Sequence, residues 1–174
     1  MKQVSIDRAT ERKYPEWIML VVAVDEKGRP NAMAAGWCMF TSASPTMIAT
    51  SISPNRYTHQ LLEDSEDFVL TFPSKAQREA VYFCGTKSGA DVDKFSETAL
   101  ETTPAAEVET PLVEDSVACF ECRKDSSLRT GDHTIFVGEV VAAHLSEKHT
   151  QKLYTVKNWA QSGAEGFKAL DQDI

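Results

Sequence analysis

The sequence predicts a mainly β fold, an antiparallel barrel with α-helical insertions. About six candidate strands and a few short helices occur without the regular strand–helix alternation that produces a doubly wound parallel sheet. No Gly-x-Gly-x-x-Gly motif follows the first apolar strand, so the main signature of a dinucleotide-binding fold is missing. The 174 residues, 42% of them hydrophobic, suit one domain, and we expect residues 1–174 to form a single domain.

The first two predicted strands form a hairpin. Residues 17–24 are apolar and rich in branched side chains, and a turn-forming stretch at 25–30 follows them. The partner strand, residues 31–40, is rich in alanine and contains Gly36, which is unusual because small residues pack poorly in a strand. Two interpretations stay open for this strand. It lines a tight barrel interior, or it lets a ligand approach the backbone closely.

Periodicity and turn residues predict the remaining elements. Strands are expected at residues 46–51, 68–72, 116–124 and 134–145, and helices at residues 54–63 and 75–83. Leu61 and Leu62 are the expected buried side of the first helix. The Glu-, Thr- and Pro-rich stretch at 97–113 predicts an extended excursion. Residues 153–159 are expected to pack, whereas the tail from about residue 160 is expected to be mobile.

The composition argues against two classes of partner. The formal net charge is −8 at pH 7, and non-specific nucleic-acid binding needs an excess of Lys and Arg. No segment approaches the roughly 18 consecutive apolar residues of a membrane-spanning helix, and the N-terminus lacks the layout of a secretory signal. We therefore expect no nucleic-acid partner, no membrane partner and a cytoplasmic location.

The four cysteines, Cys38, Cys84, Cys119 and Cys122, are expected to be free thiols because the chain lacks an export signal. Cys119 and Cys122 form a CxxC pair, but a structural zinc site normally needs a second ligand pair, which the sequence does not offer. Residues 117–122 have strand character, and strand positions three apart face opposite sides. The sequence therefore predicts no metal site and two unconnected thiols.

Residues 51–58 have the chemistry of a phosphate site. Ser53 precedes Pro54, which is well placed to open a helix. Arg56 and Thr58 follow within one turn. Amide N–H groups at a helix start favour an anion, and an arginine can hold two phosphate oxygens at once.

Residues 88–95 offer the complementary half of such a site. Ser88 provides a hydroxyl, Gly89 provides flexibility and Lys94 provides a positive charge, so this loop can close over the same anion. Ordinary loop composition also explains each stretch taken alone.

Four motifs occur in the order and at the intervals of one known family. They are Gly36-Trp37-Cys38-Met39; Ser51-Ile52-Ser53-Pro54 with Arg56 and Thr58; Cys84-Gly85 through Ser88-Gly89 to Asp93-Lys94-Phe95; and Gly131-Asp132-His133 with Gly138-Glu139-Val140. Each motif is weak alone. Together they resemble the flavin reductase-like family, whose members include flavoredoxins and small flavin reductases. The resemblance implies a split β-barrel, antiparallel with Greek-key connections, that binds FMN.

The resemblance also implies roles for individual residues. Around the FMN phosphate it places Arg56, Thr58 and the hydroxyls of Ser51 and Ser53, with Ser88 and Lys94 from the later loop. Against the isoalloxazine ring it places the backbone of Ala35, Gly36, Trp37, Cys38, Thr50, Ser51 and Ile52. Backbone N–H and C=O groups suit the ring's acceptors and donor, and small side chains let the flat ring lie close. Family members are usually homodimers, so we expect a homodimer here.

Three functions remain open at this point. In the first, the protein is an NAD(P)H-dependent flavin reductase in which the nicotinamide stacks on the flavin and His133 orients it; the alternative for His133 is a solvent-exposed turn residue. In the second, it is a flavoredoxin-like electron carrier that docks a protein partner through its acidic surface. In the third, it is a non-enzymatic barrel for another flat ligand. The partner is accordingly a small-molecule redox substrate or an electron-transfer protein.

Overall fold

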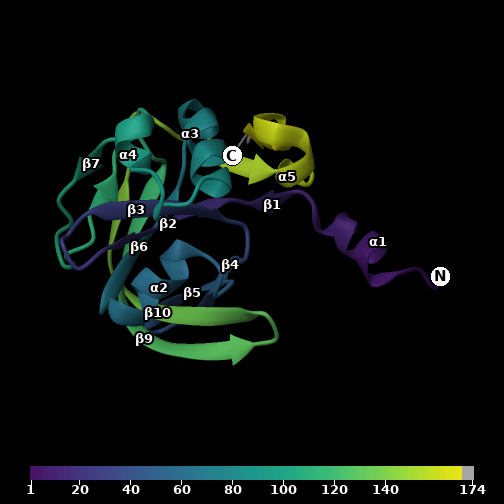
Figure 1. The fold of residues 1–174 in the computed structure, drawn as a ribbon, viewed down its shortest axis with the longest axis horizontal. Coiled ribbons are helices and arrows are strands. Elements are labelled where there is room, and N and C mark those ends of the chain that lie inside the picture. The colour runs from purple at the N-terminus through teal and green to yellow at the C-terminus, as the bar shows by residue number, and fades with distance from the viewer. Residues whose placement is uncertain (170–174) are drawn as a thin grey trace.

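A seven-stranded antiparallel sheet dominates the computed structural model, which describes residues 1–169 (Figure 1). Its strands are β2 Met19–Val24, β3 Pro30–Ala35, β4 Cys38–Ala43, β5 Thr46–Ile52, β6 Asp67–Phe72, β9 Ala118–Thr130 and β10 His133–Leu145. They lie in the order β3-β2-β6-β9-β10-β5-β4, and each neighbouring pair is antiparallel. The predicted antiparallel, mainly β fold with helical insertions is confirmed.

Short elements surround this sheet. The helices are α1 Ile6–Thr10, α2 Tyr57–Asp64, α3 Arg78–Thr86, α4 Lys94–Glu97 and α5 Trp159–Ser162, with 3₁₀ helices η1 Glu11–Lys13, η2 Lys75–Gln77 and η3 Gly163–Gly166. A second sheet joins β1 Glu16–Trp17, β11 Leu153–Thr155 and β12 Phe167–Ala169. Within the 97–113 excursion, β7 Thr102–Thr103 pairs with β8 Leu112–Val113. Two short antiparallel strands therefore hold two parts of this excursion together.

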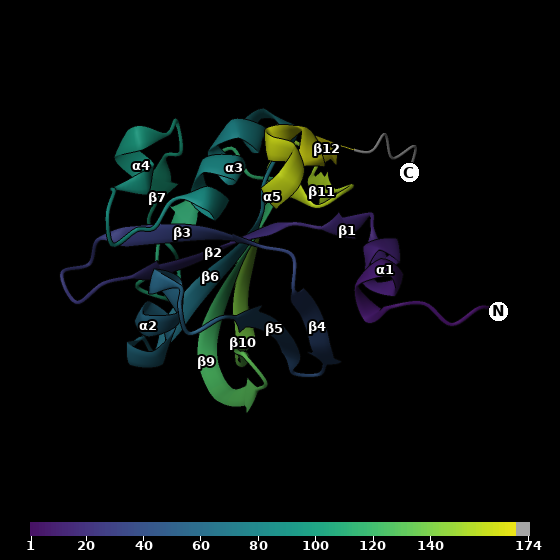
Figure 2. The ribbon, with the colours of Figure 1, turned by 45° about the vertical axis from the view of Figure 1, so that its right-hand side comes forward.

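The main sheet is buried on both faces at β2. On one face Met19 and Val21 pack in a core with Leu61 and Leu62 of α2, which confirms the predicted buried side of that helix. The other face is covered by α3, the excursion and the C-terminal elements, and Figure 2 shows α2 on one side of the sheet and α3 to α5 on the other. Residues 18–23 are all 0% exposed. A strand covered on both faces has no water-facing side, which explains its unbroken apolar sequence.

The small-residue segment forms two strands, so the predicted single strand over residues 31–40 is wrong. β3 ends at Ala35 and β4 begins at Cys38, and these two strands are the opposite edges of the sheet. Between them, a Cβ atom on Gly36 would lie 3.0 Å from Oε1 of Glu16, closer than side chains normally pack. The chain therefore crosses from one sheet edge to the other at Gly36 and Trp37.

The helix expected at residues 54–63 begins later than predicted. α2 starts at Tyr57, with Arg56 extended at the N-cap position. Pro54 lies in a turn that is closed by a hydrogen bond from the Arg56 N–H to the Ser53 carbonyl at 3.0 Å. The fixed φ angle of proline suits the second position of a turn as well as the first turn of a helix.

The C-terminal segment folds back onto the body over residues 163–169, which belong to the tail that was predicted to be mobile from residue 160. Phe167 is 0% exposed, and its ring centroid lies 5.8 Å from that of Trp159. Leu153 is buried too, which confirms the packing predicted for residues 153–159. The rest of the predicted tail, residues 170–174, lies outside the described residues. Within residues 1–169, no helix has the length and apolar character needed to cross a membrane.

Candidate functional site

A cavity of about 460 Å³ lies between the start of α2, the end of α3 and the loop that leads into α4. This volume is within the usual range of small-molecule sites. Four residues that are predicted around a phosphate line it: Arg56, Thr58, Ser88 and Lys94. The fold therefore brings the two separate sequence stretches to one place.

Lys94 provides a buried positive charge in this cavity. Its side chain is only 3% exposed, and its Nζ donates to the carbonyl oxygens of Ala32 at 2.7 Å and Cys84 at 2.8 Å. Since an ammonium group has three N–H donors, one remains for a ligand. Burial is the main cause that lowers the pKa of Lys94, and the nearby charge of Arg56 lowers it further. A bound anion would favour the charged form of Lys94.

Arg56 adds a second cation at the start of α2. It occupies the N-cap position and its side chain is exposed, so the guanidinium can move toward a ligand. The first turn of α2 contains no acidic residue. The amide N–H groups and the positive end of the helix dipole therefore have no carboxylate of that turn to compete with an anion.

Thr58 is held in the cavity wall by a neighbour from β3. Its Oγ1 accepts a hydrogen bond from Nδ2 of Asn31 at 2.8 Å, and both side chains are buried. Because Thr58 acts as an acceptor here, its own hydroxyl hydrogen can still be donated to a ligand. Oδ1 of Asn31 has no hydrogen-bond partner among the described residues. That oxygen faces Gly89 of the loop that leads into α4.

The fourth predicted residue, Ser88, is exposed at the rim of the cavity, where its Oγ accepts from the Ala90 N–H at 3.2 Å. Trp159 of α5 lines the opposite wall and was not predicted. A Cβ atom on Gly85 would lie 2.9 Å from the Trp159 ring. In the sequence, Trp159 is an isolated tryptophan in a polar segment. Its residue type does not show that the C-terminal segment folds back to the cavity.

The segments predicted to hold a flat ring lie beside one another, but outside the cavity. The Ser51 N–H donates to the Trp37 carbonyl at 2.8 Å, and Cys38 pairs with Thr50 across β4 and β5. The residues gathered around the crossing from β3 to β4 are Ala35, Gly36, Trp37, Cys38, Thr50, Ser51, Ile52 and Ser53, none of which lines the cavity. Ser51 and Ser53, whose hydroxyls are predicted near the phosphate, therefore lie outside the cavity. Residues 53–56 connect the two regions.

Cys38 is buried at this crossing and has the character of a filler. Burial raises the pKa of the Cys38 thiol to about 12, and its Sγ lies 3.3 Å from Thr50 Oγ1. The Cys38 carbonyl accepts a hydrogen bond from Trp17 Nε1 at 2.8 Å. A protonated, enclosed thiol is a poor nucleophile, so Cys38 shapes the site without reacting in it.

His133, the predicted catalytic residue, lies against the same crossing. Its ring centroid is 4.8 Å from that of Trp37, which is 52% exposed. Its Nδ1 lies 2.7 Å from Oδ1 of Asp132, and this hydrogen bond lowers the pKa of Asp132. The Asp132 carboxylate thus stays charged and orients the imidazole, whose Nε2 is a second polar atom for a ligand.

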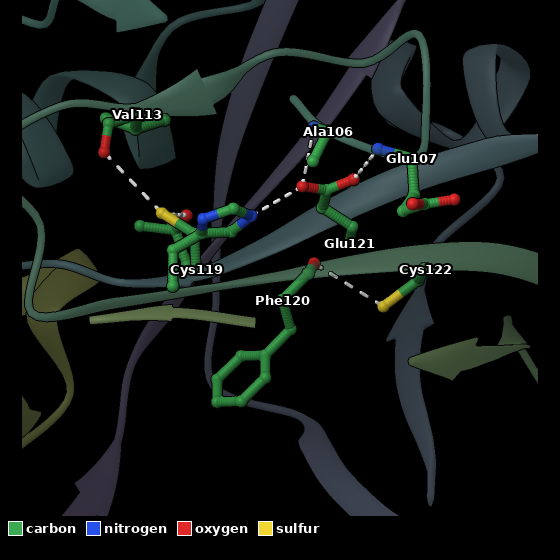
Figure 3. Close-up of polar contacts among 9 residues, drawn as sticks. Ala106, Glu107, Val113, Cys119, Phe120, Glu121 and Cys122 are labelled. Carbon is green, nitrogen blue, oxygen red and sulfur yellow. Dashed lines mark hydrogen bonds and ion pairs between the residues drawn. The ribbon is translucent and has the colours of Figure 1, made fainter. Parts of the chain in front are cut away.

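The two thiols of the CxxC pair are unconnected and lie on opposite faces of the sheet, as predicted (Figure 3). Cys119 belongs to the core on one face of the sheet and Cys122 to the core on the other. Cys119 Sγ donates to the Val113 carbonyl at 3.6 Å and Cys122 Sγ to the Phe120 carbonyl at 3.6 Å. Burial raises the pKa of both thiols. No group of metal-binding side chains occurs in the part of the chain that the structure describes.

Comparison with known proteins identifies a family. Residues 11–162 match the model described as the flavin reductase like domain. A flavin reductase of Pseudomonas putida is 25% identical over 163 residues, which cover 94% of this chain and 89% of that protein.

Two solved structures have the same fold over the full chain. The FMN-binding protein from Thermus thermophilus with bound 1-cyclohex-2-enone is 27% identical, with a TM-score of 0.81 over 100% of this chain and 96% of that one. Flavoredoxin of Desulfovibrio vulgaris (Miyazaki F) is 24% identical, with a TM-score of 0.84 over 100% and 96%. The predicted split-barrel fold is confirmed.

Proposed function

Because the chain belongs to the flavin reductase-like family, we propose that it binds FMN and acts as an NAD(P)H-dependent flavin reductase. The observation that supports FMN most strongly is the convergence of Arg56, Lys94 and the acid-free first turn of α2 on one cavity. Two cations and a helix N-terminus suit a phosphate monoester, which is doubly charged near neutral pH. The residues present therefore fit the phosphate group of FMN.

The residues around the crossing fit the flavin ring. Gly36 has no side chain that would hold a flat ring away from the backbone at the crossing, and the backbone of residues 50–52 lies beside it. The carbonyls of Trp37 and Cys38 are engaged by Ser51 and Trp17, so we expect the ring to use the other backbone groups. Residues 53–56 would then lie along the part of FMN that joins the ring to the phosphate.

Bound flavin supplies the hydride and electron chemistry, and the protein positions it and controls access. Lys94 and Arg56 hold the phosphate. Trp37 and His133 border the exposed side of the crossing, where a nicotinamide can approach. The Asp132 carboxylate keeps the His133 ring in place through Nδ1, which leaves Nε2 to contact the dinucleotide.

The same proposal includes a homodimer in the cytoplasm with a small-molecule redox substrate. The four free, buried thiols suit a reducing compartment. The open edge of the main sheet at β4 supports association with a second copy.

Stopped-flow mixing of the FMN-loaded protein with NADH and, separately, with NADPH tests the reductase function. We expect at least one nucleotide to bleach the flavin absorbance. His133→Ala should slow this step several-fold without changing the FMN dissociation constant, whereas His149→Ala, whose Nε2 lies 3.3 Å from Asp115, is the matched control. No bleaching by either nucleotide would favour an electron carrier. A protein that binds no FMN would favour a barrel for another ligand.

A further inference from the structure

The N-terminal arm, residues 1–13, buries none of its side chains. Every residue of the arm is exposed, and neither α1 nor η1 contains a buried residue. Figures 1 and 2 both show α1 projecting away from the body of the molecule. Helices shorter than about 12 residues are marginal in water unless they pack on a surface. The five-residue α1 therefore needs a surface that its own chain does not provide in this conformation.

The composition of the arm suits an acidic protein surface with apolar contacts. Val4 is 41% exposed and Ile6 is 83% exposed. Four basic and two acidic side chains give the arm a formal charge of +2, so the remaining residues of a chain whose total is −8 have a charge of −10. A second copy of this chain thus offers the arm a body of opposite charge. The first ten residues precede the stretch that matches the family.

The β4 edge of the main sheet is open and carries two exposed apolar side chains. β4 pairs only with β5 in the sheet order, and Met39 and Phe40 are 58% and 42% exposed. The strand contains no charged residue and no proline, the devices that normally protect an exposed edge. The opposite edge, β3, is covered by α3 and α4. An exposed apolar edge of this kind marks an interaction site.

The arm leaves the body close to this edge. Nζ of Lys13 lies 5.5 Å from the centroid of the Trp37 ring and 2.7 Å from Oε1 of Glu16. From there the arm points outward and does not cover the β4 edge of its own chain. A twofold axis beside the edge would let each arm lie on the other copy, because the same patch then serves on both subunits.

We propose that two copies of this chain exchange their N-terminal arms, so that Val4 and Ile6 of one copy pack on Met39 and Phe40 of the other. The inference rests on the homodimer of the proposed function and names the contact that makes it. It concerns a segment outside the FMN cavity, so arm exchange and flavin binding can fail independently.

Disulfide trapping tests the arm contact in the full, FMN-loaded chain. All four native cysteines are buried free thiols, so cysteines introduced at Ile6 and Met39 would be the accessible ones. After mild oxidation, we expect the double variant Ile6→Cys/Met39→Cys to run as a covalent dimer on a non-reducing gel, with the 6–39 disulfide found by peptide mapping. Each single variant should remain a monomer on the same gel.

Two results of the trapping experiment would reject arm exchange. One is a 6–39 disulfide within a single chain, which would place the arm on its own β4 edge. The other is a protein that is dimeric by light scattering but forms no 6–39 disulfide, which would leave the homodimer and FMN binding in place without the arm.

A charge substitution gives an independent measurement. Ile6→Asp should raise the dimer dissociation constant about tenfold or more by analytical ultracentrifugation, and FMN affinity measured in parallel reports separately on the cavity. Leu145→Asp is the matched control, because Leu145 is 82% exposed at the far end of β10 from His133. An unchanged dimer in Ile6→Asp overturns the proposal. So does arm-dependent binding to phosphatidylserine vesicles with an unchanged dimer, which would assign the arm to a membrane surface.

Discussion

Oδ1 of Asn31 lies 2.0 Å from the position that a Cβ atom would take on Gly89. The loop that leads into α4 therefore approaches β3 as closely as the backbone allows, and no side chain fits at residue 89. Since Nδ2 of Asn31 also donates to Thr58, one buried amide positions two walls of the cavity. The contact explains why the loop needs glycine here for space, in addition to the flexibility that the sequence indicates.

Gly89→Ala should displace the loop that leads into α4. Overpacking of this kind costs about 1–3 kcal/mol, and we expect a lower melting temperature and a weaker FMN affinity. Fluorescence titration with FMN and thermal unfolding measure the two effects. In the Asn31→Ala background the same change should cost less, because the oxygen that it meets is gone. Equal costs in both backgrounds would show that this contact does not position the loop.

Arg56→Ala should weaken FMN binding by about 2 kcal/mol, the usual loss for a hydrogen bond to a charged group. Riboflavin, which lacks the phosphate, should bind equally to wild type and variant. Arg29→Ala is the control, since the Arg29 side chain is 72% exposed and pairs with Asp25 at 2.6 Å. A similar loss of affinity for riboflavin and FMN would show that Arg56 does not bind the phosphate.

The Lys94 charge should make FMN binding depend on pH. Burial lowers the pKa of Lys94 below its ordinary 10.5, while a bound phosphate favours the charged form. FMN affinity should therefore fall as pH rises through the lowered pKa of the free protein. The ratio of FMN to riboflavin affinity between pH 7 and pH 10 isolates this effect, because ionisation of the ring is common to both ligands. In Lys94→Met, the ratio of FMN to riboflavin affinity should no longer change between pH 7 and pH 10.

Glu121 should stabilise the fold through its charge. Its buried carboxylate accepts hydrogen bonds from the N–H groups of Ala106 at 2.9 Å and Glu107 at 2.6 Å and lies 2.5 Å from Nε2 of His144 (Figure 3). Burial alone would raise the pKa of Glu121, but these hydrogen bonds outweigh it and the net pKa lies below the ordinary 4.5. The charge therefore adds stability above about pH 4.5, and this stability is lost as pH falls through the lowered value.

Glu121→Gln measures that contribution. At pH 7 we expect a loss of about 2 kcal/mol in urea unfolding, and a loss that becomes smaller as pH falls through the lowered pKa of the wild-type carboxylate. Glu107→Gln is the control, because the exposed Glu107 side chain can change while its backbone N–H still binds Glu121. A loss of equal size above and below that pKa would mean that shape, and not charge, is responsible.

The four cysteines should be unreactive in the native protein. All are buried, and burial raises the pKa of Cys38 to about 12 and of Cys84 to about 11. Dithionitrobenzoate should therefore label almost no thiol in the folded chain and all four in guanidinium. Fewer than four in the unfolded, unreduced chain would reveal a disulfide that contradicts the opposed positions of Cys119 and Cys122.

Most strands were predictable because local signals bound them. The strand expected at 46–51 is Thr46–Ile52, and the one expected at 68–72 is Asp67–Phe72. Apolar, branched runs between turn residues determine such strands with little help from the rest of the chain. The crossing at Gly36 was missed because alanine and glycine fit either a strand or a connection, and only Glu16 from another strand decides between them.

The site was predictable in part for a related reason. The cavity brings together Arg56, Thr58, Ser88 and Lys94, as expected. Cationic and hydroxyl side chains are the types that bind anions, so the sequence alone marks them as candidates. Ser51 and Ser53 have the same hydroxyl chemistry, but the turn at Pro54 separates them from the cavity. The position of Trp159 depends on the return of the C-terminal elements, which has no local signal.

The passage at Gly36 and Trp37 is the covalent link between the outermost strands of the main sheet. A ligand bound at these two residues therefore contacts the ends of both edge strands at once. If flavin binds there, its release should destabilise β3 and β4 together. Amide hydrogen exchange should then become faster in both edge strands, although the two strands are not hydrogen-bonded to each other.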